Sequence, residues 1–160
     1  MPDSTPGAPP FTAGPADEPA LSDGRAIAER AADEAAADAE RRRLAREPLP
    51  VLEQHPEQVF QVWPNEVIHV ERRTALVERG QDIPPSVGTL YLTSRRLVHV
   101  GSEAVEEIEL ERISNLAVAQ DRVLLIEVAD GSDLAIEVDR PRLLRVQVAA
   151  AHAAMRERDA

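Results

Sequence analysis

The chain is 160 residues long, carries a formal net charge of −11 and contains no cysteine, and all 18 of its basic residues are arginine. This length suits one domain with a terminal extension. The lack of cysteine excludes a disulfide framework and thiol chemistry. The acidic balance argues against general nucleic-acid binding and against strong adhesion to anionic membranes. No apolar run approaches the ~20 residues of a membrane span, and no signal-peptide pattern is present, so we expect a cytoplasmic protein.

The first third of the chain has a composition unlike the rest. Residues 1–21 are rich in proline, glycine and acids, which predicts a disordered tail. Residues 22–47 are an alanine, glutamate and arginine run without proline, which predicts a helix that Ser22 or Asp23 caps. Residues 48–59 then form a linker stiffened by proline.

This N-terminal helix has little apolar surface with which to pack. Its larger apolar residues are chiefly Ile27 and Leu44. The only further stripe is shallow and consists of Ala26, Ala31, Ala35 and Ala39. We therefore expect a mobile arm that becomes ordered on a partner or on a second copy, with permanent packing on its own domain as the alternative.

The middle of the chain alternates between strand and turn signals. Residues 87–92 and 96–100 read as two strands, and the polar residues 93–95 between them have the length of a hairpin loop. Residues 66–78 fit a strand less well, because Arg72 falls on the apolar face. A bulge would explain that arginine, and a helix is the alternative reading.

Further strands follow, and then the hydrophobic period changes. Segments 105–110, 113–118, 123–129 and 134–138 are predicted strands, and the turn Asp130-Gly131 separates the last two. After residue 139 the apolar spacing becomes helical. Asp139 can cap the start of this helix and Pro141 suits its first turn. The apolar stripe consists of Leu144, Val148, Ala151 and Met155, widened by Leu143, Ala150 and Ala154.

Seven antiparallel strands followed by one helix is the element order of the pleckstrin-homology-like superfold. The hairpin GTLYLTSRRL, residues 88–97, resembles the G-x-L-[YF]-[LV]-T-x-x-R-[LI] motif of its GRAM and bacterial PH-like branch. The resemblance covers roughly residues 60–157, so we expect a domain of this kind over residues 60–160, with a mainly β fold and helices. In this fold a barrel is capped by the C-terminal helix, and here the N-terminal helix would be an addition to it.

Candidate ligand-binding residues are the arginines that such a fold would bring to one end of the barrel: Arg72, Arg73, Arg95 and Arg96. Acidic residues lie among them, and Arg96 occupies the motif position, where a structural role is favoured over ligand binding. The four histidines lack metal-ligand spacing, and the acidic run 103–111 lacks the pattern of a calcium loop. We therefore expect no metal, no cofactor and no catalytic residues.

The sequence favours a non-catalytic interaction module that binds a protein partner or associates with itself. The alternative is binding of a lipid headgroup or a phosphorylated ligand through the four arginines. Nucleic acid is not an expected partner, and any membrane contact should be weak.

Overall fold

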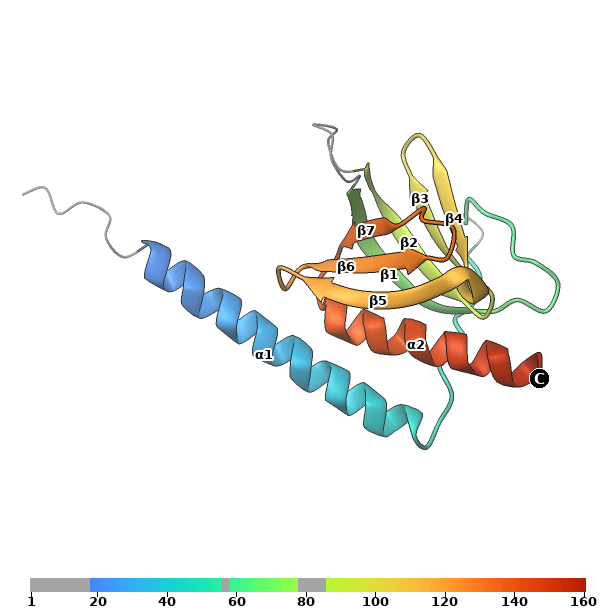
Figure 1. Cartoon of the computed structure of the whole chain (residues 1–160), viewed down its shortest axis with the longest axis horizontal. Coiled ribbons are helices and arrows are strands. Elements are labelled where there is room, and N and C mark those ends of the chain that lie inside the picture. The colour runs from blue at the N-terminus through green and yellow to red at the C-terminus, as the bar shows by residue number, and fades with distance from the viewer. Residues whose placement is uncertain (1–17, 56–57, 78–85) are drawn as a thin grey trace, which may run out of the picture.

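The computed structural model describes residues 18–55, 58–77 and 86–160. Within them, seven strands form one antiparallel sheet in the order β4-β3-β2-β1-β7-β6-β5 (Figure 1). The elements in chain order are α1 (Glu18–Leu44), β1 (Ile68–Val77), β2 (Ser86–Thr93), β3 (Arg96–Gly101), β4 (Val105–Glu109), the 3₁₀ turn η1 (Leu110–Arg112), β5 (Ile113–Ala119), β6 (Val123–Val128), β7 (Leu134–Glu137) and α2 (Pro141–Arg158). The predicted mainly β fold with a helix at each end is confirmed.

The sheet bends over on itself, and α2 lies across the open side (Figure 1). The main core fills the space between them, and its fully buried members include Leu92, Leu124, Ile126, Leu144 and Val148. The helical stripe predicted for α2 is therefore the part that closes the core, except that Leu143 is half-buried outside the core cluster and Ala154 is exposed.

The β2–β3 hairpin forms where the sequence predicts it. β2 ends at Thr93 and β3 begins at Arg96. The Thr93 hydroxyl oxygen accepts hydrogen bonds from the backbone N–H groups of Arg95 (3.1 Å) and Arg96 (2.9 Å), which holds the turn. Gly88 is needed in β2 because a Cβ there would lie 2.1 Å from the backbone oxygen of Val100 on β3.

Residues 68–77 are a strand, so the helical alternative for this segment is wrong. Its register is continuous through Arg72, so no bulge lies there; the irregularity falls between Ile68 and Val70. This irregularity separates two cores, because Val70 joins the main core while Ile68 packs with Phe60 in a second, smaller cluster. Arg72 remains on the core-facing side of β1, near the start of α2.

Helix α2 begins at Pro141 as predicted, but Asp139 does not cap it. The N-cap position is Arg140, which has a left-handed backbone (φ 56°) and makes no side-chain capping bond. The helix is capped instead by the side-chain carboxylate of Asp33, a residue of α1. Its oxygens accept the backbone N–H groups of Arg142 (2.9 Å) and Leu143 (3.1 Å).

Helix α1 begins at Glu18 and ends at Leu44, so residues 18–21 are helical rather than disordered; residues 1–17 lie outside the described part of the chain. Its C-terminal half packs on α2, with Asp33 and Ala37 buried, whereas residues 23–32 are exposed throughout. The N-terminal half buries little of its surface: Arg30 lies 3.8 Å from Asp121 in the β5–β6 turn, and the start of the helix projects beyond the domain (Figure 1). We call residues 18–32 the projecting half of α1.

The expectation of a mobile arm is therefore wrong for the second half of α1. The predicted alanine stripe is also the wrong face, since Ala31, Ala35 and Ala39 are exposed. The face of α1 that packs on α2 includes the polar residues Asp33 and Glu40, so apolar periodicity in the sequence does not identify it. The linker is anchored as well, because Leu49 joins the main core.

Candidate functional site

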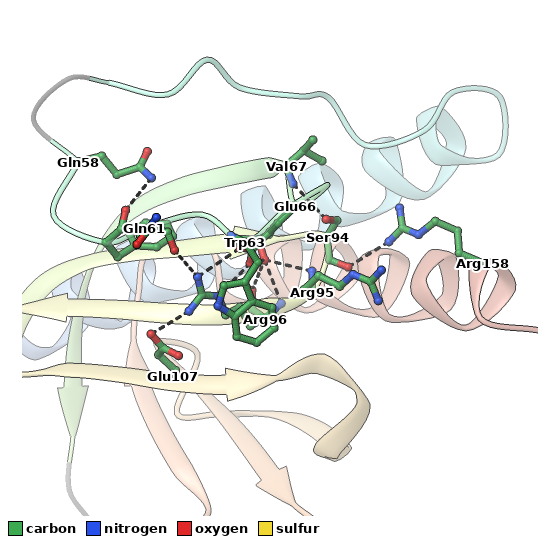
Figure 2. Close-up of polar contacts among 12 residues, drawn as sticks. Gln58, Gln61, Trp63, Glu66, Val67, Ser94, Arg95, Arg96, Glu107 and Arg158 are labelled. Atoms are coloured by element: carbon green, nitrogen blue, oxygen red, sulfur yellow. Dashed lines mark hydrogen bonds and ion pairs between the residues drawn. The ribbon is translucent and has the colours of Figure 1, made fainter.

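One buried ion pair organises the outer side of the β2–β3 hairpin. Arg96 and Glu66 are 2% and 4% exposed, and their Nε and Oε1 atoms are 2.9 Å apart (Figure 2). The Thr93 hydroxyl donates to the same carboxylate oxygen at 2.6 Å, and the backbone N–H of Trp63 donates to Oε2 at 2.6 Å. The backbone carbonyl of Gln61 accepts from Arg96 at 2.7 Å. We call residues 58–67 the strap, because this segment crosses the hairpin and is held there by Arg96.

Aromatic and acidic side chains enclose the Arg96 guanidinium. Its central carbon lies 4.2 Å from the ring centroid of Trp63 and 5.5 Å from that of Phe60, within the range of cation–π attraction. Glu107 of the edge strand β4 adds a second ion pair at 2.8 Å. Burial alone lowers the pKa of Arg96, but the hydrogen bonds and charges of Glu66 and Glu107 outweigh burial and raise it.

The Glu66 carboxyl is held ionised by the same network. Burial favours its neutral form, yet hydrogen bonds from Arg96, Thr93 and the Trp63 backbone keep the pKa of Glu66 below its usual range. Both charged groups of this buried pair have hydrogen-bond partners inside the protein. The pair therefore holds the surrounding segments in place and leaves no charge free to bind a ligand. The arrangement therefore fixes the strap to the hairpin.

The same hairpin turn is tied to the end of α2. The Ser94 hydroxyl accepts the backbone N–H of Val67 at 3.1 Å, while the Ser94 carbonyl accepts from Arg158 at 3.0 Å (Figure 2). Arg95 lies 3.6 Å from the carboxylate of Asp159 and is partly exposed. The strap, the hairpin and the C-terminal end of α2 therefore form one polar junction.

Arg72 lies in a different place, beneath the start of α2. Its guanidinium donates to the backbone carbonyls of Asp139 (3.0 Å) and Arg140 (3.3 Å) and to the side-chain oxygen of Gln147 (3.3 Å). Burial lowers its pKa, which the nearby charges of Asp33, Asp139 and Glu40 oppose. Arg72 therefore holds the turn that leads into α2.

Arg73 points away from Arg72, because neighbouring strand residues face opposite sides of a sheet. It is exposed and lines a shallow cavity of about 210 Å³ together with Arg122, Val87, Glu137 and Asp139. The structure thus distributes the four candidate arginines among separate surroundings. Arg95 and Arg96 share the hairpin, but neither joins Arg72 or Arg73 in one site.

The residues that hold α1 to the domain were missed from the sequence. Arg142 of α2 donates to Asp121 in the β5–β6 turn at 2.5 Å, and this hydrogen bond holds the pKa of Asp121 below its usual range. Arg142 also lies 3.5 Å from the Asp33 carboxylate. Farther along α1, the Glu40 carboxylate accepts a hydrogen bond from the Gln147 side chain of α2 at 3.4 Å. No spacing in the sequence connects Asp33 to residues more than a hundred positions away.

Two strands of the sheet carry buried polar side chains, His99 on β3 and Thr74 on β1, that form no catalytic or binding group with other described residues. His99 is 3% exposed and Thr74 is 5% exposed. Neither the Nε2 atom of His99 nor the Oγ1 atom of Thr74 has a hydrogen-bond partner among the described residues. Burial lowers the pKa of His99, partly offset by the Thr74 backbone and the charge of Glu106.

Across the described ranges, no group of histidine, aspartate and glutamate residues is arranged to hold a metal ion. Neither helix in those ranges is long and apolar enough to cross a membrane. Among the side chains that the structure describes, the larger apolar ones that reach the surface are Ile27, Val51, Leu52, Val59, Trp63, Val87 and Val105. Of these, Ile27 alone lies on the projecting half of α1.

Comparisons with known proteins identify the fold and nothing narrower. No family model matches the sequence, and no curated protein matches it. Among solved structures, the chain is similar to the Vps36 N-terminal PH domain, with a TM-score of 0.50 and 12% identity over 68% of this chain and 92% of that chain.

Two other solved structures are similar at lower scores. They are Inner Membrane Complex Sub-compartment Protein 3 from Toxoplasma gondii (TM-score 0.43, 11% identity, 56% of this chain and 77% of that chain) and the C-terminal domain of an unknown protein from Leishmania infantum (TM-score 0.42, 18% identity, 56% and 84%). The strand order, the closing helix α2 and the match to the Vps36 domain together give one conclusion. The chain has a pleckstrin-homology-like fold.

Proposed function

We propose that this chain is a non-catalytic interaction module of the GRAM or bacterial PH-like kind that binds protein in the cytoplasm, either another protein or a second copy of itself. The buried charged residues support a structural rather than a catalytic role. Arg96, Glu66 and Arg72 each form ion pairs or hydrogen bonds with other residues of the chain. No nucleophile–base pair stands out among the polar contacts of the described residues.

The observation that carries the proposal is the projecting half of α1. Every side chain from residue 23 to 32 is exposed, and Ile27 keeps 69% of its surface in contact with solvent. Helices in proteins gain most of their stability from packing an apolar face. A helix that extends past its own domain and presents a large aliphatic side chain is suited to pack on another molecule.

A capture experiment tests this function. The full chain is used as bait in a lysate of the native host, beside a chain that lacks residues 1–31. The shortened chain keeps Asp33, Ala37 and Leu49, so its domain should retain its contacts. We expect a defined protein, or the chain itself, to be retained by the full bait and lost from the shortened one. Equal capture by both, with equal melting temperatures, would remove the support that α1 gives.

The second candidate is binding of an anionic headgroup or phosphorylated ligand through Arg72, Arg73, Arg95 and Arg96. Arg73 and Arg122 favour it, since both line the 210 Å³ cavity. Glu137 and Asp139 line the same cavity and reduce its attraction for anions. We rank this function second because Arg72 and Arg96 already serve internal contacts.

A further inference from the structure

A groove with an apolar floor runs between α1 and α2 where the two helices separate. Its walls are Leu44 and Ala45 from the end of α1 and Val146, Ala149 and Ala150 from α2, around a volume of about 460 Å³. We call this the α1–α2 groove. The two charged side chains that line it are Arg41 and Arg145.

The groove continues toward the start of α2. Arg41 and Arg145 also line an adjoining cavity of about 440 Å³, whose other walls are Ala37, Val118, Arg142 and the acidic Glu34 and Asp38. Arg145 is exposed and takes part in no hydrogen bond or ion pair among the described residues. In a chain with a net charge of −11, an apolar floor flanked by arginines suits an apolar occupant whose neighbouring charges are acidic.

The projecting half of α1 offers such an occupant. Within residues 23–32, Ile27 is the large exposed aliphatic side chain. Asp23 lies one turn before Ile27 and has no ion-pair partner among the described residues, while Arg25 and Glu29 pair with each other at 2.9 Å. The part of α1 around Ile27 therefore presents one apolar side chain and one unpaired carboxylate.

Helix geometry places Ile27 on the same side of α1 as the groove. Positions 27, 34, 41 and 45 follow one another at spacings of seven, seven and four, which share one face of an α-helix. Ile27 lies about five turns before Ala45, or about 27 Å along the axis. A two-fold axis at right angles to α1, near Ala36, exchanges these two positions between copies.

We propose that two copies of this chain associate through antiparallel α1 helices, with Ile27 of each copy seated in the α1–α2 groove of the other. The inference rests on the proposed function and names a second copy as the partner. The contact between Ile27 and the α1–α2 groove then occurs twice, once in each direction, as an isologous interface requires.

Charges of both signs lie between the two ends of the antiparallel pair. Along the shared side, α1 presents Arg30, Glu34, Asp38 and Arg41 in that order. In the antiparallel pair, Glu34 of one copy lies opposite Asp38 of the other, and Arg30 and Arg41 lie about one turn away from these carboxylates and offset their repulsion. All four side chains also have partners within their own copy. Arg30–Glu34 (3.0 Å) and Arg41–Asp38 (2.6 Å) pair along α1, while Arg30–Asp121 and Arg142–Glu34 (both 3.8 Å) join α1 to the domain.

Sedimentation velocity of the full chain over a range of concentrations tests the proposal. We expect a reversible monomer–dimer equilibrium. Ile27→Arg should weaken it at least about ten-fold, because the burial of one isoleucine is lost and a third guanidinium faces Arg41 and Arg145. Ala149→Arg should weaken it similarly from the other side. Both positions are exposed in the single chain, so folding should be unaffected.

Matched controls place the same charge elsewhere on each helix. Ala28→Arg and Ala154→Arg alter exposed positions that do not line the groove, and we expect each to leave the equilibrium unchanged. A wild-type chain that remains monomeric at about 1 mM, or equal weakening by the variants and their controls, would overturn the proposal. Capture of a different protein through residues 1–31 would still support the proposed function, so the two can fail separately.

Discussion

Asp33 caps a helix to which it does not belong: its Oδ2 atom accepts the backbone N–H of Arg142 at 2.9 Å, across 109 positions of sequence. Arg140, the residue at the N-cap position, cannot satisfy these donors itself. The carboxylate also lies where the positive end of the α2 dipole favours an anion. One contact thus completes α2 and fixes the second half of α1 to the domain.

Replacing Asp33 tests this relationship. We expect Asp33→Ala to lower the free energy of unfolding by about 1–2 kcal/mol or more, because two backbone donors lose their acceptor in a buried place. Asp33→Asn should lose less, since its side-chain oxygen still accepts. Urea unfolding measures both, and Asp38→Ala on the exposed side of α1 is the control. Equal stability of Asp33→Ala and wild type would show that α1 does not cap α2.

A second prediction concerns the strap. Arg96→Met leaves Glu66 buried without its main partner, and we expect a loss of about 3–5 kcal/mol. Adding Glu66→Gln to Arg96→Met should recover part of that loss, because the unpaired carboxylate is then removed. A double-mutant cycle by urea unfolding measures the coupling. Additive effects of the two changes would contradict the role we give to this pair.

The stability of the protein should fall as the pH drops through the histidine range. Burial lowers the pKa values of His99 and His69 in the folded state. The unfolded chain then binds these protons at higher pH than the folded chain does. The free energy of unfolding is therefore highest above the unfolded pKa and declines as the pH falls from about 7.5 to 5.5.

Variants identify the source of that decline. His99→Leu should flatten the pH dependence over this interval, and His69→Gln should do so independently. His55→Gln changes a histidine that is largely exposed and serves as the control. A carboxyl whose pKa is lowered, such as Glu66, stabilises the folded state fully above its unfolded pKa and loses that stabilisation only at more acidic pH, so it adds no slope between about pH 7.5 and 5.5. An unchanged slope in His99→Leu would show that His99 is not held neutral by burial.

Membrane binding should be weak. With a net charge of −11 and Arg72 and Arg96 engaged internally, we expect little co-sedimentation with vesicles of phosphatidylglycerol or phosphoinositide at physiological salt. Strong binding that disappears in a variant with Arg73→Glu and Arg95→Glu would instead move headgroup recognition to first place. Binding that these changes leave intact would point to a different surface.

The elements that could be predicted from the sequence are those whose structure follows from the local pattern of apolar and turn residues. Strands β2, β3, β6 and β7 follow from two-residue alternation and short turns, and α2 follows from helical spacing. Arg72 was harder to place, because a charged residue on a core-facing position makes sense only once the start of α2 lies above it. The docked face of α1 could not be predicted, since Asp33 is stable when buried only because α2 offers it two donors.

Hydrogen exchange along α1 is the most direct measurement of the central claim, that one half of this helix belongs to the domain and the other half is presented to a partner. At concentrations where the chain is monomeric, we predict that residues 33–44 exchange nearly as slowly as β6 and that residues 23–32 exchange fast. Raising the concentration, or adding the captured partner, should slow residues 23–32. Fast exchange throughout residues 23–44, or equal protection of both halves in the monomer, would contradict the account.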